Sequence, residues 1–116
     1  MQVRLRSISG VSVIELGGKI TIGDGGAELR QIVVDLIEGG HSKLLISMEK
    51  VGFMDSAGLG ELVACYKKAA ERGGAVKLLK PSGKVADLLS LTKMSEILEI
   101  YQDEGEAIAS YCKERS

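Results

Sequence analysis

Residues 44–62 read LLISMEKVGFMDSAGLGEL and contain the unit on which the fold depends: a strand, a connection and the start of a helix. Residues 44–48 are short and almost continuously apolar, which is typical of a central strand covered on both faces. A helix is expected to begin near Ser56, because apolar residues then recur at helical spacing. The pair Gly73-Gly74 predicts where that helix ends.

The same alternation of strand and helix extends to both sides of this unit. Toward the N-terminus, stretches of period two predict a β-hairpin ended by Gly17-Gly18, and a helical stripe of apolar residues follows up to Gly39-Gly40. The remaining expected elements are a strand at 76–79, a helix opening at 81–82, a short edge strand at 97–101 and a C-terminal helix. The order β-β-α-β-α-β-α-β-α predicts one α/β domain over residues 1–116, with a mixed sheet, an N-terminal hairpin and about four helices packed against it.

The composition excludes several function classes. The chain has 116 residues, with 15 Lys and Arg against 16 Asp and Glu, and a formal net charge of −1. This balance lacks the positive surplus that neutralises phosphates, so no nucleic acid is expected as a partner. One His, two Cys and no Trp leave few metal or nucleophile constellations to assemble. We therefore expect that the protein is not an enzyme and holds no metal or cofactor.

The cysteines and the N-terminal residues indicate a compartment. Cys65 and Cys112 form no C-x-x-C pattern, and two cysteines in a domain able to build its own core are typical of reduced cytosolic thiols. Residues 1–10 contain no continuous apolar segment, so neither a signal peptide nor a membrane anchor is expected. The sequence predicts a cytoplasmic protein without direct membrane insertion.

Three further features carry weaker signals. Residues 23–26, Gly-Asp-Gly-Gly, precede a helix as phosphate-binding loops do, but they lack the spacing and the lysine of a P-loop. A flexible loop or a partner-contact edge is the favoured interpretation over a nucleotide site. His41 has no adjacent acidic residue to orient it as a general base. Cys65 and Cys112 are interpreted as packing or surface thiols.

The connection before the second predicted helix carries the most specific signal. Gly58 and Gly60 lie in the expected first turn, where each glycine costs up to about 1 kcal/mol relative to alanine. Their presence suggests a need for bare, approachable backbone. Ser56 is expected at the N-cap or next to it, which is an ordinary capping role. An exposed serine at the positive end of a helix is also a good phosphoacceptor, and local chemistry leaves both interpretations open.

Residues 53–60, Phe-Met-Asp-Ser-Ala-Gly-Leu-Gly, resemble the D-S-x-G-L-G signature of bacterial anti-sigma-factor antagonists, which are single-domain proteins of the STAS family. The resemblance implies a phosphorylation-dependent partner switch. In the family, the unphosphorylated protein binds an anti-sigma factor that is also a serine kinase, which releases a sigma factor, and a PP2C-type serine phosphatase reverses the phosphorylation. By this match Ser56 is the expected phosphoacceptor. The expected partner-binding residues are Asp24, Asp55, Ser56, Ala57, Gly58, Leu59 and Gly60.

The sequence departs from the family pattern at two places. Many members have a second serine where this chain has Ala57, and antagonists commonly lack the glycine-rich turn at residues 18–26. The alternative function is an accessory STAS subunit that regulates a membrane transporter or a stress-signalling complex, with a small nucleotide hydrolase as a third hypothesis. The chain is expected to be a monomer or a weak dimer.

Overall fold

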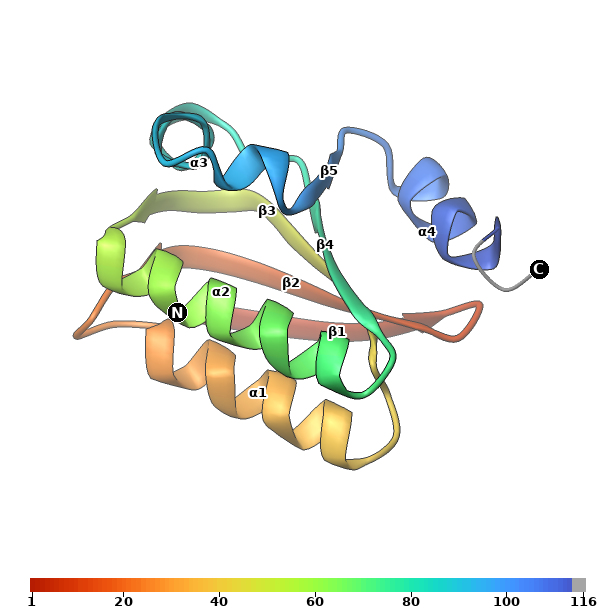
Figure 1. The fold of residues 1–116 in the computed structure, drawn as a ribbon. Coiled ribbons are helices and arrows are strands. Elements are labelled where there is room, and N and C mark those ends of the chain that lie inside the picture. The colour runs from red at the N-terminus through yellow and green to blue at the C-terminus, as the bar shows by residue number, and fades with distance from the viewer. Residues whose placement is uncertain (114–116) are drawn as a thin grey trace.

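One five-stranded sheet forms the centre of the chain, and its strands lie in sequence order (Figure 1). The computed structural model describes residues 1–113. The strands are β1 (Gln2–Ile8), β2 (Val11–Ile20), β3 (Lys43–Met54), β4 (Ala75–Leu79) and β5 (Glu99–Tyr101). Strands β1 and β2 pair antiparallel, whereas each later neighbouring pair is parallel. The predicted hairpin and mixed sheet are therefore confirmed.

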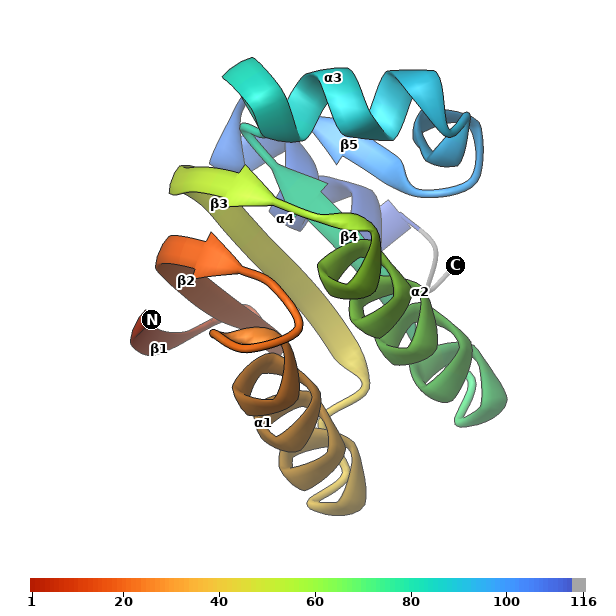
Figure 2. The same cartoon turned by 90° about the vertical axis from the view of Figure 1, so that its left-hand side faces the viewer.

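Helices cover both faces of this sheet. They are α1 (Gly26–Glu38), α2 (Ser56–Glu71), α3 (Gly83–Leu91) and α4 (Glu104–Lys113), with a short 3-10 helix, η1 (Met94–Glu96). Helices α1, α2 and α3 pack on one face, and α4 packs on the other (Figure 2). The element order agrees with the predicted one.

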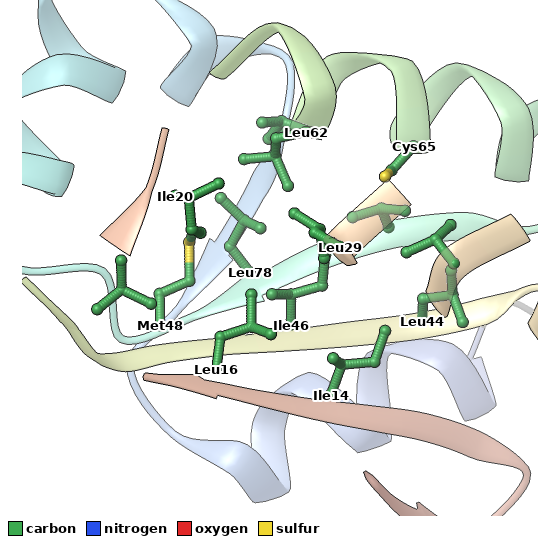
Figure 3. Close-up of a cluster of buried hydrophobic side chains, with 14 of the residues drawn as sticks. Ile14, Leu16, Ile20, Leu29, Leu44, Ile46, Met48, Leu62, Cys65 and Leu78 are labelled. Atoms are coloured by element: carbon green, nitrogen blue, oxygen red, sulfur yellow. The ribbon is translucent and has the colours of Figure 1, made fainter. Parts of the chain in front are cut away.

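Strand β3 is buried on both faces, as its apolar run predicts. Leu44, Ile46 and Met48 belong to the larger core cluster, and Leu45 belongs to the smaller one under α4. Figure 3 shows the larger cluster, in which side chains of β2 and β3 meet residues such as Leu62 and Cys65 of α2. Because side chains alternate across a strand, neighbouring residues of β3 supply two separate cores.

Polar contacts hold α4 against the sheet. The Tyr111 hydroxyl lies within hydrogen-bond distance of the carbonyl oxygens of Leu44 and Ala75. The Lys77 side chain is fully buried, with its Nζ 2.9 Å from Ser110 Oγ and 4.2 Å from the centre of the Tyr111 ring. These partners offset the cost of burying a cationic group.

Strands β2 and β3 are longer than predicted, and their extensions form the edge of the sheet at which both strands end. The antiparallel pairing of β1 with β2 ends at Gly17, as predicted for the hairpin, but strand β2 itself continues through Gly17-Gly18 to Ile20, paired with β3. Strand β3 continues to Met54. Register shifts lie between Glu15 and Gly17 and between Gly18 and Lys19, and Gly18 has a φ of +98°. At each shift β3 has one residue more than β2, so the period of two is interrupted there and the pairing resumes beyond it.

Candidate functional site

The site lies where the parallel strands β2 and β3 end. Ile20 is paired with Met54, so both strands finish at the same edge of the sheet. Figure 2 shows the two arrowheads at this edge, with α1 and α2 leading away from it. Residues 21–25, which we call the β2–α1 loop, therefore lie beside the start of α2. Loops at the carboxyl ends of parallel strands are the usual place for function in such sheets.

Asp55 is the N-cap of α2 and joins three parts of the site. Its backbone is extended, and its Oδ1 accepts a hydrogen bond of 2.7 Å from the amide of Gly58. Its Oδ2 lies 3.5 Å from the amide nitrogen of Ile22, which donates to it, and its own amide donates to the carbonyl of Ile20 at 3.3 Å. Of the two positions expected for Ser56, the structure shows the adjacent one: Ser56 is the first residue of the helix.

Gly58 and Gly60 have different structural roles. A Cβ added at Gly58 would lie 1.9 Å from the carbonyl oxygen of Ile20, so only glycine lets α2 approach the end of β2 this closely. A Cβ at Gly60 would meet no atom within 4 Å, and Gly60 is exposed. The approachable backbone expected at both positions is thus found at Gly60, whereas Gly58 is buried for packing.

The expected site residues divide into an outward and an inward group. Ser56, Gly60 and Asp24 are exposed, and Ala57 is half-buried. Gly58 and Leu59 are buried, and the Asp55 carboxylate is turned to the amides that it binds. Asp24 Oδ1 also lies 3.6 Å from the α-amino group of Met1. A partner that approaches this edge meets the outward group first.

Sequence reasoning missed Ile22, the most exposed large apolar residue of the described chain. Ile22 is 86% exposed at the tip of the β2–α1 loop, next to the start of α2. A shallow hollow beside it is lined by Thr21, Ile22, Gly26, Ala27, Arg30, Ala57 and Glu61. The sequence offers one sign of this role: Ile22 stands between a threonine and a glycine-rich turn, outside any strand or helix pattern that would place its side chain in the core.

The glycine-rich residues 23–26 form a closed turn. The amide of Thr21 donates to the carbonyl of Asp24 at 2.7 Å, and the amide of Gly26 donates to the carbonyl of Thr21 at 3.3 Å. Gly25 has a φ of +88°, and a Cβ there would lie 2.3 Å from the carbonyl oxygen of Lys19. The turn requires glycine at this position for its own packing.

Other reactive side chains lie apart from this edge. Burial raises the pKa of the Cys65 thiol to about 12, with a further contribution from the Glu61 carboxylate, so this thiol stays protonated. Cys112 and His41 are exposed. Across residues 1–113, no group of three His, Cys, Asp or Glu side chains is placed to hold a metal ion. No helix in this part of the chain is long and apolar enough to cross a bilayer.

Comparison with known proteins relates this geometry to a family. The family model of the STAS domain matches residues 2–107. The anti-sigma-B factor antagonist of Bacillus subtilis (strain 168) is 36% identical over 72 residues, which are 62% of this chain and 65% of that protein. The chain thus spans slightly less than two thirds of the length of this curated relative.

Solved structures share the fold over nearly the whole chain. A candidate anti-sigma factor antagonist from Thermotoga maritima has a TM-score of 0.86 and 26% identity, with 93% of this chain and 92% of that chain covered. The anti-sigma factor antagonist SpoIIAA in its unphosphorylated form has a TM-score of 0.71, 19% identity and coverage of 97% and 98%. The phosphorylated form of SpoIIAA, from Bacillus, has a TM-score of 0.73 and 21% identity, with 95% of this chain and 99% of that chain covered.

Proposed function

This chain belongs to the STAS domain family, and from that membership we propose that it is an anti-sigma factor antagonist switched by phosphorylation of Ser56. The proposed partner is an anti-sigma factor with serine kinase activity, and a PP2C-type serine phosphatase resets the switch. Two findings support the proposal: a curated relative is named an anti-sigma-B factor antagonist, and a neighbour of the same fold is known in phosphorylated and unphosphorylated forms.

The observation that carries the proposal is the position of Ser56. Its side chain is exposed at the first position of α2, and Asp55 caps the same turn, so the hydroxyl is presented on ordered backbone. A phosphate at a helix N-terminus meets the positive end of the helix dipole. It also adds a charge of about −1.5 to −2. The fold therefore tolerates the phosphate, while a partner that packs on this edge meets new bulk and charge.

The proposed step is a phosphoryl transfer from ATP. Ser56 Oγ attacks the γ-phosphorus, the bond from that phosphorus to the bridging oxygen of ADP breaks, and the hydroxyl proton passes to a base of the kinase. The phosphatase reverses this with water, which attacks the phosphorus, restores the serine hydroxyl and releases inorganic phosphate. This chain supplies the acceptor hydroxyl and its position.

We define the docking surface as Ile22, Asp24, Ser56, Ala57 and Gly60. These residues come from the β2–α1 loop and from the first turns of α2, and they include the proposed phosphoacceptor. Ile22 and Ala57 line the same hollow. The exposed isoleucine offers apolar area, and the small residues let a partner approach the helix closely. Such a combination suits a partner that packs directly against the helix start and therefore cannot accept a phosphate there.

Phosphate mapping tests the switch. The protein is incubated with ATP and the candidate serine kinase of its organism, and the modified residue is located by mass spectrometry. We expect one phosphate on Ser56, none on the Ser56→Ala variant, and retained kinase binding by that variant. Phosphate on another residue, with Ser56 unmodified, would contradict the proposed switch.

Substitution of Ile22 tests the docking surface. Ile22→Ala removes apolar area worth about 2 kcal/mol when buried, which corresponds to binding weakened roughly 30-fold. The matched control is Leu91→Ala, because Leu91 is similarly exposed at 82% but lies at the end of α3. Isothermal titration with the kinase measures both variants. Equal affinities of the two variants would place the interface elsewhere.

A further inference from the structure

A single carboxylate ties the β2–α1 loop to the start of α2. Asp55 Oδ1 accepts from Gly58 within the helix, and Oδ2 accepts from the amide of Ile22 at the loop tip. The next residue, Ser56, is the proposed phosphoacceptor. The side chain that holds Ile22 in the docking surface is thus adjacent in the chain to the group whose charge changes.

The two hydrogen bonds of Asp55 differ in length. The bond to Gly58 is 2.7 Å long, which is short for an amide donor, and the bond to Ile22 is 3.5 Å long. Hydrogen bonds weaken as the donor–acceptor distance grows past about 3.2 Å. A disturbance of the carboxylate therefore breaks the link to the loop before it breaks the helix cap.

We propose that phosphate on Ser56 acts through Asp55 to free the tip of the β2–α1 loop, so that Ile22 is no longer held in the docking surface. This inference rests on the proposed function, because it takes Ser56 as the phosphoacceptor. Asp55 is then a positioning residue that conveys the phosphorylation state to the loop.

Repulsion between neighbouring negative charges is what weakens the bond from the Ile22 amide to Asp55. The phosphate carries about −1.5 to −2 charges beside the −1 of the Asp55 carboxylate. It also competes for the amides at the helix start, which favour negative charge. The rest of the loop keeps its own bonds, including the amide of Thr21 to the carbonyl of Asp24 at 2.7 Å. The change is therefore confined to the tip.

Solvent exchange of single amides, measured by NMR on the isolated chain, tests this coupling. Phosphoserine is built in at position 56 during translation, so no kinase is needed. We expect the Ile22 amide to exchange roughly threefold to tenfold faster in the phosphorylated chain, as the loss of one hydrogen bond predicts. The Thr21 amide, bonded within the loop, serves as the internal control and should not change.

The Asp55→Asn variant keeps the cap and removes the acceptor for Ile22. Asparagine is as good an N-cap as aspartate, so the variant is expected to fold, but when its one carbonyl oxygen caps Gly58 its NH₂ group cannot accept from the Ile22 amide. The Ile22 amide should therefore exchange fast in this variant already, and phosphate on Ser56 should change its exchange rate less than twofold. An unchanged Ile22 amide in the phosphorylated wild-type chain, or an equal acceleration in Asp55→Asn, would overturn the inference. Failure of a kinase to modify Ser56 would instead count against the proposed function, because the built-in phosphoserine does not depend on it.

Discussion

Substitution of Gly58 by alanine places a methyl group against the end of β2. The new Cβ would lie 1.9 Å from the Ile20 carbonyl oxygen and 2.7 Å from its carbon, so backbone must move. Overpacking of this kind costs about 1–3 kcal/mol, and displacement of the Ile20 carbonyl from the Asp55 amide costs about 1 kcal/mol more. Alanine returns up to about 1 kcal/mol through its higher helix propensity. We expect a net loss of about 2 kcal/mol in the free energy of unfolding.

The matched control is Gly60→Ala, two residues further along the same helix. A Cβ at Gly60 meets nothing within 4 Å, so only the propensity gain of about 0.5–1 kcal/mol remains. In thermal unfolding followed by circular dichroism, Gly58→Ala should lower the Tm by about 8 °C and Gly60→Ala should raise it by about 2–4 °C. A Tm for Gly58→Ala equal to or above that of Gly60→Ala would refute the packing explanation.

Further predictions concern the helix cap and the two thiols. Asp55→Ala should cost about 0.5–2 kcal/mol in urea unfolding, whereas Ser56→Ala should cost less than about 0.5 kcal/mol, because Asp55 supplies the capping oxygen. A thiol reagent at pH 8 should modify only the exposed Cys112 in the folded chain, and Cys65 should react after unfolding. Rapid reaction of both thiols in the folded chain would contradict the burial of Cys65. Burial raises the pKa of Cys65 from 9.0 to about 12, so the unfolded chain loses this proton first and stability should fall as the pH rises above 9. This slope should be smaller in Cys65→Ala than in the control Cys112→Ala.

The sequence was sufficient for the element order but not for the ends of β2 and β3. Apolar runs and glycine pairs mark a strand or helix locally, which is why β3 and the hairpin were predictable. The extension of β2 to Ile20 depends instead on its pairing with β3, in which Gly17 and Gly18 lie opposite Lys50 and Val51. A glycine that ends a strand and a glycine that continues it are identical in sequence, so only pairing with the neighbour distinguishes them.

The site was predictable as a segment, while the roles of its residues were not. Aspartate and serine are both favoured N-caps, and neighbouring positions 55 and 56 offer one of each. The bond from the Asp55 amide to the Ile20 carbonyl fixes which residue is extended and which is helical. Ile22 was missed for a similar reason, since its place beside α2 depends on contacts between segments more than 30 residues apart.

The contact between Gly58 and the end of β2 makes the docking surface a discontinuous epitope. A peptide of residues 50–60 contains Ser56 and the whole signature motif, but it has neither the Ile20 carbonyl nor Ile22. A segment this short is also only marginally helical in water. Linear peptides should therefore be poor substitutes for the domain in binding and kinase assays. In a cell, newly made or unfolded copies should likewise not bind the partner, so the proposed switch would respond only to chains that have completed their fold.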